Sequence, residues 1–369
     1  MKETMLAVAW NGGKYPESMQ LLEFPKPVAG PGWVVIENRA AGICGSDLHY
    51  LLGTARHLIP DSNLPAVLGH ENSGIVVEVG PDVSGLVPGD RVAGEPLHGC
   101  LELGRTPCPM CRVGQYQRCP ELTLVGVPVK RMLPGGYGQY SAYHHTRLFK
   151  VPDNVSDEAA SLLDVLAVGV HAVGRAQPRM GDTVVVLGCG VVGLDLIQCL
   201  RLQGVLSVIA VAKYGFQAEM ARELGASEVI VLERGADAVR EVMSLTDGWG
   251  ADQVYECVGG ASDTVQQGID MCRPGGKVVI LGVFGGQHPV NLQTMVFKEV
   301  DLLSSSCYSY TEDGCRREYQ VALTLLSAGL VDHESLVTHR FRIDQWEEAL
   351  DAAINHRENR SLKVQLVHG

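Results

Sequence analysis

The sequence predicts an α/β protein in two parts, an irregular β-barrel and a doubly wound parallel sheet of six strands. Three observations support this fold class. The chain has 369 residues, more than one hydrophobic core usually supports. Residues 1–155 read as short alternating segments broken by glycine and proline. From about residue 181, apolar runs alternate with segments of helical spacing, which is typical of a parallel sheet covered on both faces.

The individual elements follow from local patterns in chain order. In the first part, the clearest strand-like segments are WVVIENRAAG (33–42), GHENSGIVVEVG (69–80) and GDRVAGEP (89–96). The six strands predicted in the second part are 183–188, 205–212, 227–232, 252–259, 276–283 and 300–306. The helices predicted between them are 192–204, 216–226, 236–245 and 264–272. The tail predicts a helix at 312–328, an extended segment at 339–343, a helix at 344–356 and a last strand at 362–367. We expect that strand to pair with the first part, since it needs a partner sheet.

Composition and charge argue against several functional classes. The net charge of −12 disfavours a sequence-independent grip on nucleic acid or on anionic lipid. No run approaches the ~18 apolar residues of a membrane span. The opening MKETMLAVAW has no long apolar core and does not read as a secretory signal. We therefore expect a cytoplasmic protein whose 11 cysteines serve as metal ligands and buried thiols rather than as disulfides.

A glycine-rich turn, GCGVVG, lies between the first strand and the first helix of the second part. Gly188 permits the tight bend, Gly190 lets a pyrophosphate approach the backbone, and Gly193 lets the helix pack on the strand. Val191 and Val192 begin that helix, whose N-terminus faces the anion. The motif predicts a dinucleotide site. The alternative is a turn that needs glycine for its shape alone.

The end of the second strand bears on which dinucleotide binds. An acid about 20 residues after the turn would hold the ribose 2′-hydroxyl of NAD. The sequence has Ala212 in this place, followed by Lys213. Because a carboxylate would repel a 2′-phosphate and none is present there, we favour NADP(H) over NAD(H). The alternative is a solvated lysine and NAD held without the acid.

Four cysteines gather in the first part of the chain. They are Cys100, Cys108, Cys111 and Cys119, and the last three read C-x2-C-x7-C. In a chain that we expect to be reduced, this pattern predicts one closed zinc site with four thiolate ligands. The ion would replace the hydrophobic core that the loop lacks. The alternative is four reduced thiols in a loop without metal.

A second cluster joins AGICGSDLHY to LGHENSG. The first segment supplies Cys44, and the second supplies His70 and Glu71. Neighbouring residues of a regular strand point to opposite faces, so His70 and Glu71 reach one ion only from a kinked loop, which Gly69 and Gly74 indicate. A mixed Cys, His and acid set with an open position is typical of catalytic zinc. A histidine taken alone is more often a satisfied core or surface residue.

Together these segments resemble the zinc-dependent medium-chain dehydrogenase/reductase family, which includes the alcohol and polyol dehydrogenases. The shared features are ICGSDLHY, LGHENSGIVVEVG, GDRVAGEP, the four cysteines, a helical VLAVGVHAV before GCGVVG, and KVVILGV, in this order. The resemblance covers nearly the whole chain. It implies a GroES-like catalytic domain formed by residues 1–160 and 305–369. A Rossmann dinucleotide-binding domain, residues 161–304, would be inserted between them.

The resemblance also implies roles for single residues. It places four residues at a catalytic zinc: Cys44, His70, Glu71 and Asp164. Ser46 matches the hydroxyl beside the zinc-bound oxygen, and His49 matches the outer end of a proton relay. Asp47, in the same segment, we expect to be structural. Beyond the glycine-rich turn, the residues assigned to the cofactor are Val168, Gly282 and Val283. The candidate residues of the substrate pocket are Tyr50, His57 and Tyr308.

Two features depart from the family pattern. The family lobe reads C-x2-C-x2-C-x7-C, whereas here LELGRTP separates Cys100 from Cys108, so the match of Cys100 is the loosest. Sorbitol-type members carry an Arg–Tyr pair after the EVD stretch, whereas this chain has Cys307 before Tyr308. Loss of the guanidinium removes a donor fork for hydroxyls, which favours a less polar alcohol or ketone over a sugar alcohol.

The resemblance therefore implies a zinc-dependent alcohol dehydrogenase or ketone reductase (EC 1.1.1.-). It would transfer a hydride between a mostly secondary alcohol and NADP(H) or NAD(H), with one catalytic and one structural Zn²⁺. The expected partner is a small alcohol or ketone, and the expected assembly is a homodimer or homotetramer. Two alternatives stay open: a zinc-independent quinone or enone reductase, and a non-catalytic dinucleotide-binding relative.

Overall fold

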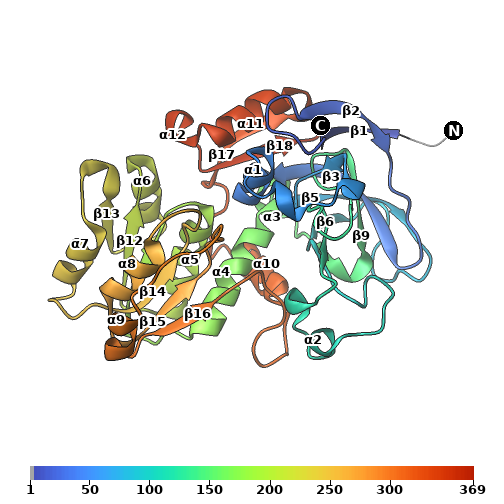
Figure 1. Ribbon diagram of the computed structural model, residues 1–369. Helices are drawn as coiled ribbons and strands as arrows, with labels where there is room; N and C mark the ends of the chain where they lie inside the picture. The colour runs from blue at the N-terminus through green and yellow to red at the C-terminus, as the bar shows by residue number, and fades with distance from the viewer. Residues whose placement is uncertain (1–3) are drawn as a thin grey trace. The chain divides into compact units, whose positions relative to one another are not determined.

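The computed structural model describes residues 4–369, which form two compact units (Figure 1). Unit 1 holds the chain up to Asp164 together with Tyr319–Gly329 and His333–Gly369. Unit 2 holds Val165–Glu318 and Leu330–Asp332. The chain therefore leaves unit 1 once its first part is complete and returns to it for the tail.

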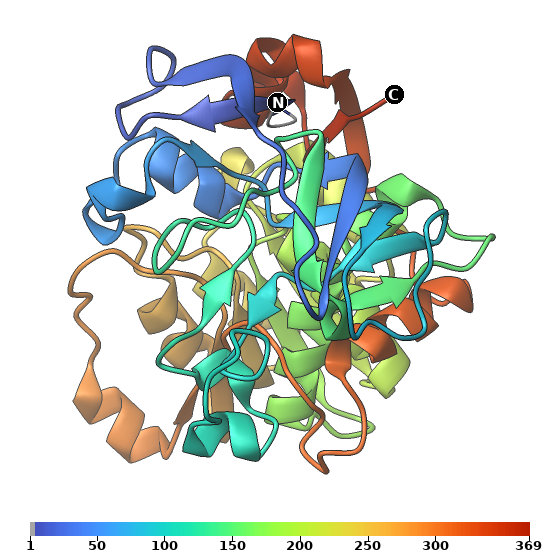
Figure 2. The same cartoon turned by 90° about the vertical axis from the view of Figure 1, so that its right-hand side faces the viewer.

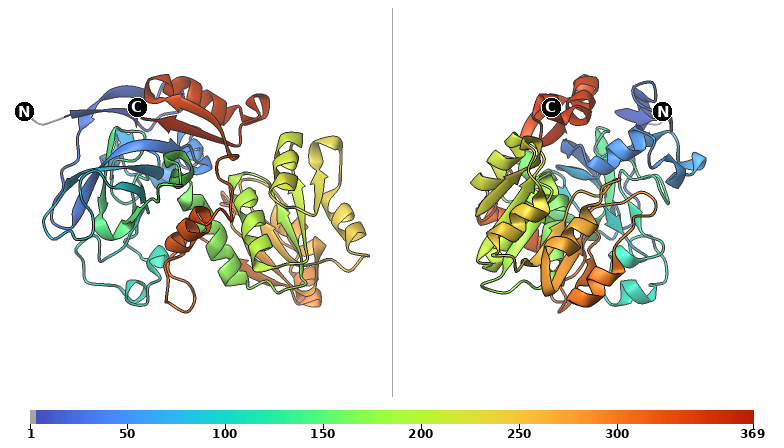
Figure 3. Two further views of the ribbon diagram at one scale, coloured as in Figure 1. Left: turned by 180° about the vertical axis from the view of Figure 1, so that it is seen from behind. Right: turned by 60° about the vertical axis from the view of Figure 1, so that its left-hand side comes forward.

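Unit 2 is built on a six-stranded parallel sheet in the order β13-β12-β11-β14-β15-β16. Its strands are β11 Thr183–Leu187, β12 Ser207–Ala212, β13 Glu228–Val231, β14 Ala251–Glu256, β15 Cys272–Ile280 and β16 Asp301–Ser304. The central strands β11 and β12 are buried along nearly their whole length, because helices cover both faces of the sheet (Figures 1 and 3). This confirms the predicted Rossmann sheet.

The helices that accompany this sheet begin near the predicted positions. They are α4 Leu163–Ala176, α5 Val191–Gln203, α6 Gly215–Glu223, α7 Ala238–Leu245, α8 Thr264–Met271 and α9 Leu292–Lys298. Val242 of α7 and Ile269 of α8 share one buried core cluster with Val185 and Val254 of the sheet. Only α9 has no counterpart among the predicted helices; it is seven residues long, and while Met295 packs against the core, Leu292, Val296 and Phe297 are exposed.

Unit 1 contains a seven-stranded sheet in the order β10-β6-β5-β3-β18-β17, with β9 also paired to β3 (Figure 2). Its strands are β3 Trp33–Gly42, β5 Glu71–Val79, β6 Arg91–Gly94, β9 Tyr140–His144, β10 Leu148–Lys150, β17 Val337–Arg342 and β18 Lys363–Val367. The two smaller sheets contain β1 Thr4–Trp10, β2 Met19–Pro25 and β4 Ala66–Val67, and β7 Leu97–His98 and β8 Thr123–Leu124. The helices that begin and end in unit 1 are α1 Gly45–Leu51, α2 Pro109–Arg112, α3 Asp157–Ser161, α11 Trp346–Ile354 and α12 His356–Asn359. This is the GroES-like part of the fold.

The tail confirms one prediction and corrects another. Strand β18 pairs antiparallel with β3, so the last strand joins the sheet of the first part as expected. The helix predicted at 312–328 is shorter, because α10 spans Glu318–Ser327. Residues before it form a tight turn in which Asp313 accepts from Thr311 Oγ1 and from the Cys315 N–H, and Gly314 has a φ of +71°. Side chains that bond to the nearby backbone in this way compete with the helix.

Candidate active site and dinucleotide-binding edge

The first candidate site lies in unit 1, where β3 ends beside the start of β5. Their antiparallel register sets Gly42 opposite Glu71. Cys44 follows β3 and caps the N-terminus of α1, whereas His70 directly precedes β5. One ligand atom each from Cys44, His70 and Glu71 lies within 4.8 Å of the others. The fold thus brings together three of the four residues that the sequence assigns to a catalytic zinc.

Glycines shape this corner of unit 1. Gly69 has a φ of +91°, and a Cβ there would lie 2.6 Å from the Tyr137 ring. This backbone bend turns His70 out of the strand, so that its imidazole and the Glu71 carboxylate face the same space. Gly74 has a different role, because it lies inside β5, where a Cβ would collide with the Glu37 carbonyl of β3. The predicted kink therefore lies at Gly69 alone.

Glu71 is buried and paired with a lysine from the other end of the chain. Lys363 Nζ lies 2.9 Å and 2.7 Å from its two carboxylate oxygens, and it also donates to the Ile43 carbonyl at 3.2 Å. Burial alone would lower the pKa of Lys363, but the negative charge of Glu71 outweighs it and raises the pKa. Because Lys363 lies on β18, the last strand supplies part of this site.

Asp47 lies behind the His70 imidazole. Its buried carboxylate accepts from the Cys44 N–H at 3.1 Å and from the Tyr137 hydroxyl at 3.0 Å, and Oδ1 lies 3.5 Å from His70 Nδ1. Burial lowers the pKa of His70, but Cys44 and Asp47 raise it by more, so that it stands well above 6.5. Carboxylates in this position fix the ring orientation of metal-binding histidines.

The chemistry of the donor set fits zinc. A thiolate, an imidazole and a carboxylate are all ligands that Zn²⁺ accepts. The neighbouring anions that raise the pKa of His70 favour positive charge at this place, and a divalent cation would meet the same field. Three protein ligands leave a fourth position open, as in catalytic zinc sites.

The other residues predicted here differ in their placement. Ser46 is half-buried in the first turn of α1, and the exposed His49 in its last turn has Nδ1 2.9 Å from Thr54 Oγ1. Tyr50 is buried beside the cluster, and burial, followed by the charge of Asp47, raises its pKa to about 12. His57 is exposed in a short turn and joins none of these contacts.

Asp164, the fourth predicted ligand, is not among the three clustered residues. It is half-buried in the first turn of α4, where its charge adds to burial in raising the pKa of Tyr143 and of Tyr319. The sequence placed it at the ion by its match to the family alone, since no spacing links it to Cys44. Its role as a ligand stays a prediction.

The four cysteines also converge in unit 1. One Sγ each from Cys100, Cys108, Cys111 and Cys119 lies within 4.8 Å of the others. Cys108 caps α2 and accepts from the Cys111 N–H at 3.4 Å, and this bond is the main reason that the pKa of Cys108 falls to about 7. Cys100 Sγ lies 3.5 Å from Cys119 Sγ, so the LELGRTP insertion is accommodated without displacing Cys100. Four thiolates fit a structural zinc.

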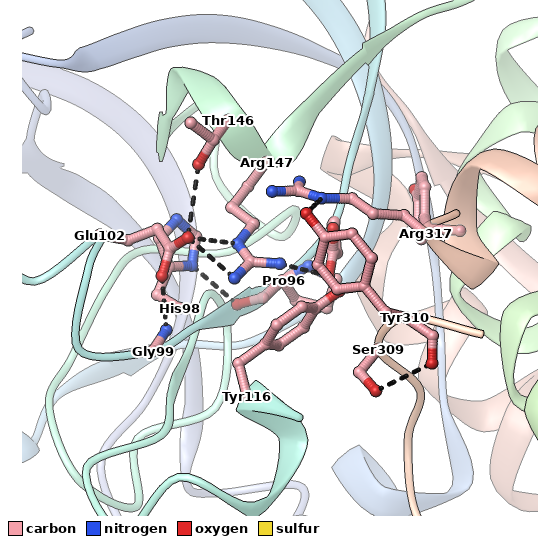
Figure 4. A network of polar contacts seen from close by, with 12 residues as sticks. Pro96, His98, Gly99, Glu102, Tyr116, Thr146, Arg147, Ser309, Tyr310 and Arg317 are labelled. Atoms are coloured by element: carbon pink, nitrogen blue, oxygen red, sulfur yellow. Dashed lines mark hydrogen bonds and ion pairs between the residues drawn. The ribbon is translucent and has the colours of Figure 1, made fainter. Parts of the chain in front are cut away.

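A buried charge network supports this four-cysteine lobe (Figure 4). Arg147 is 2% exposed, and its guanidinium donates to Glu95 at 2.7 Å and to Glu102 at 3.0 Å. It also lies 3.7 Å from the centre of the Tyr116 ring, a residue between the last two cysteines. The second oxygen of Glu102 accepts from the N–H of Gly99, which precedes Cys100. The network thus ties both ends of the lobe to the β10 region.

In unit 2, the glycine-rich turn has the geometry that its sequence predicts. Gly188 has a φ of +104°, and a Cβ at Gly193 would collide with the Gly188 carbonyl. Gly190 caps α5, and a Cβ there would meet no atom within 4 Å, so the helix N-terminus is open to an anion. Val191 is buried and Val192 half-buried in the first turn of that helix.

The remaining cofactor candidates lie in unit 2 as well. A Cβ at Gly282 would collide with the buried Glu256 carboxylate, whose Oε1 accepts from the Val258 and Gly259 N–H groups at 2.8 Å and 2.9 Å. Val283 is 76% exposed next to Gly282. Val168 is half-buried on α4, and Tyr308, a substrate-pocket candidate, is buried.

Near the end of β12 lies the carboxylate of Glu233, which the sequence-based cofactor prediction did not include. Ala212 is buried and Lys213 exposed. Glu233, which follows β13, accepts from the Gly215 N–H at the start of α6 with an N···O distance of 2.7 Å. A carboxylate is therefore present next to the position of Ala212, although it comes from another strand.

Comparisons with known proteins agree with this architecture. Residues 30–153 match the family model "Alcohol dehydrogenase GroES-like domain", and residues 191–328 match "Zinc-binding dehydrogenase". A sorbitol dehydrogenase of Bacillus subtilis is 31% identical over 93% of this chain and 92% of its own. An L-idonate 5-dehydrogenase of Vitis vinifera is 32% identical over 94% of this chain and 91% of its own. The chain belongs to the zinc-containing medium-chain alcohol and polyol dehydrogenase family.

Two solved structures of dehydrogenases have the same fold. Alcohol dehydrogenase TADH from Thermus sp. ATN1 superposes with a TM-score of 0.85 at 31% identity, covering 99% of this chain and 100% of that one. The 2R,3R-butanediol dehydrogenase from Bacillus subtilis gives 0.82 at 28% identity, covering 98% and 99%. No helix within residues 4–369 is long and apolar enough to cross a membrane.

Three polar side chains of this medium-chain dehydrogenase make contacts at the two sites that the sequence did not predict. Lys363 contacts Glu71, and Asp47 contacts His70. Glu233 accepts a hydrogen bond from the N–H of Gly215, the first residue of α6. Asp47 had a local signal, since the adjacent GSDLHY segment carries the match to the family. For Lys363, which is 292 residues from its partner, the sequence carries no spacing signal.

Proposed function

We propose that this chain is a zinc-dependent alcohol dehydrogenase that also reduces ketones, and that Cys44, His70 and Glu71 hold its catalytic zinc. The convergence of these three ligand atoms within 4.8 Å carries the proposal. A zinc-independent quinone or enone reductase would not need this set, and a non-catalytic relative would not need an open fourth position. We propose that Asp164 approaches the same ion, and that residues 1–160 and 305–369 form the catalytic domain around residues 161–304.

When bound, zinc supplies a Lewis acid that lowers the pKa of the alcohol, and the dinucleotide supplies the hydride acceptor. The chain's own residues orient the reactants and move the proton. Ser46, in the first turn of α1, would accept the alcohol proton at Oγ and pass its own hydroxyl proton on, and the exposed ring of His49 would exchange that proton with water. Asp47 would restrict the orientation of the His70 ring. Lys363 would neutralise the Glu71 carboxylate whenever Glu71 is not bound to zinc.

For the substrate, we propose a small, mostly secondary alcohol or its ketone. The names of the relatives support this class, because sorbitol and 2R,3R-butanediol both carry secondary alcohols. Cys307 in place of a guanidinium favours the less polar end of the range. We further propose a homodimer or homotetramer, which light scattering tests, and a cytoplasmic location, in keeping with cysteines that form no disulfide within residues 4–369.

For the cofactor, we propose that both dinucleotides bind and that NADP(H) is favoured. Ala212 leaves the second strand without its acid, and the ammonium of Lys213 would attract a 2′-phosphate. The Glu233 carboxylate opposes this preference. Rates with NADP and NAD over a panel of alcohols and ketones measure the balance.

The Cys44→Ser variant tests the zinc assignment. We expect turnover of every alcohol, followed at 340 nm, to be lost while dinucleotide binding persists, because the Rossmann unit does not contain Cys44. Wild-type protein should hold about two zinc ions per chain, and the variant should lose one of them. The control is Cys315→Ser, which removes an exposed thiol outside both clusters. Full activity in metal-replete Cys44→Ser would rule out the assignment, and zinc without turnover in the wild type would favour the non-catalytic relative.

A further inference from the structure

We propose that Glu233 is the carboxylate that discriminates between the 2′-hydroxyl and the 2′-phosphate of the dinucleotide. This inference rests on the proposed function, since it takes the glycine-rich turn as the site of NAD or NADP. In Rossmann sheets the acid that selects NAD usually ends the second strand. Here that position is Ala212, and the structure supplies an acid from the neighbouring strand instead.

The backbone brings Glu233 to this place. Strand β13 runs parallel to β12, and their register sets Val231 opposite Ala212. Beyond the paired residues, the Glu233 N–H donates to the Lys213 carbonyl at 3.1 Å. Glu233 is therefore held alongside the residue that follows the second strand, at the edge where ligands of open parallel sheets bind.

The side chain of Glu233 already occupies an anion position. Its Oε1 accepts from the Gly215 N–H at 2.7 Å, and Gly215 is the first residue of α6. A helix N-terminus carries partial positive charge and exposed N–H donors, so a carboxylate is stabilised there. A 2′-phosphate at the same place would compete with the carboxylate for this donor.

In the part of the chain that the structure describes, Glu233 has no cationic side chain as a partner. Within residues 4–369 it forms no ion pair, and its second oxygen accepts no hydrogen bond, so that oxygen is available to a ribose hydroxyl. The ammonium of Lys213 lies 5.4 Å from the centre of the Tyr214 ring at the same helix start. Glu233 therefore favours a hydroxyl and repels a phosphate, whereas Lys213 attracts the phosphate.

Calorimetric titration of the whole chain tests the inference without turnover. The probes are NAD, NADP and adenosine 2′,5′-bisphosphate. The Glu233→Gln variant keeps the shape of the side chain and removes its charge, so we expect the two phosphorylated probes to bind about tenfold tighter and NAD several-fold weaker. The matched control is Glu228→Gln, an exposed acid at the opposite end of β13, which should leave all three affinities unchanged.

The outcomes separate this inference from the proposed function. If Glu233→Gln changes the NADP-to-NAD affinity ratio no more than Glu228→Gln does, the inference is wrong while the dinucleotide site stands. If wild-type protein binds none of the probes, both fail. If the ratio shifts as expected but no alcohol or carbonyl is turned over, Glu233 has the proposed role and the catalytic proposal alone is wrong.

Discussion

Asp47 illustrates at the residue scale how one buried carboxylate links the segments that form the candidate metal site. Its two oxygens reach the Cys44 N–H, the Tyr137 hydroxyl and the His70 imidazole, which belong to a loop, a second loop and the start of a strand. All three groups converge on one fully buried side chain, so a change at Asp47 reaches both Cys44 and His70.

The Asp47→Asn variant tests this dependence. We expect kcat/KM and zinc affinity to fall about 10- to 100-fold, the usual effect of removing a carboxylate behind a metal-binding histidine. Tyr137→Phe, which removes one contact of Asp47 and leaves its charge, should have a smaller effect. Zinc competition with a chelator and circular dichroism of both variants measure the result. Equal effects of the two changes would mean that Asp47 acts only as a structural hydrogen-bond acceptor.

Single residues also show what the sequence could predict of the site. Cys44, His70 and Glu71 were predicted together because they occur in two recognisable motifs, and Gly69 indicated the bend before His70. Glu233 was not, because the prediction looked for an acid along β12, whereas the parallel register delivers one from β13. A pairing between strands is a property of the sheet, and no local spacing reports it.

At the scale of elements, we expect the four-cysteine lobe to depend on Arg147, which directly precedes β10. Arg147→Met would leave the carboxylates of Glu95 and Glu102 buried without their cation, and breaking a buried pair in this way costs about 3–5 kcal/mol. We expect urea unfolding to show a loss of this size, together with faster release of zinc. Arg105→Met is the control in the same lobe, since Arg105 pairs with Glu121 at the surface, and it should cost about 1 kcal/mol or less. Similar small losses in both variants would contradict the supporting role of Arg147.

A second element-scale prediction concerns pH. His98 of β7 is fully buried; its Nδ1 lies 2.9 Å from the Pro96 carbonyl and its Nε2 accepts from the His144 N–H at 3.1 Å, so the neutral ring uses both nitrogens. Burial is the main reason that its pKa falls to about 3. Between pH 6.5 and 3 the unfolded chain therefore binds a proton that the folded chain does not, and stability falls as the pH falls.

At pH 5 this difference amounts to about 2 kcal/mol relative to pH 7 and above. The His98→Gln variant has no titrating ring, so its stability should depend less on pH by about this amount between pH 7 and 5. Denaturant unfolding of both proteins at several pH values measures the difference. Parallel pH profiles would show that His98 is protonated in the folded state after all.

The strands and helices of the sheet were predictable because each apolar run is buried on both faces and keeps its period. The helix predicted at 312–328 begins later than expected, because the Asp313 side chain accepts from the Cys315 N–H and favours a turn there. Helix α9 was not predicted because it has only seven residues, which is too short for a clear helical period in the sequence. Side-chain hydrogen bonds that compete with the helix thus explain the late start of α10, and the lack of a clear helical period explains why α9 was not predicted.

At the scale of the whole molecule, the two units should respond to different ligands. Removal of zinc with a chelator should increase amide hydrogen exchange across residues 99–120 of unit 1, because the metal replaces a core there. Saturation with a dinucleotide should slow exchange around residues 186–193 and 212–215 of unit 2. Mass spectrometry of the exchanged peptides measures both effects. Loss of protection across β11–β16 on zinc removal alone would contradict this division.

The position of Lys363 also bears on how the enzyme is made. The ammonium that neutralises the buried Glu71 carboxylate lies on β18, which pairs with β3 of the opening segments. While the chain is still on the ribosome, Cys44, His70 and Glu71 emerge long before their counterion, and the sheet around them lacks a strand. A nascent chain arrested before residue 363 would therefore leave the Glu71 carboxylate without its cation, and the mature site is assembled only once β18 has been translated.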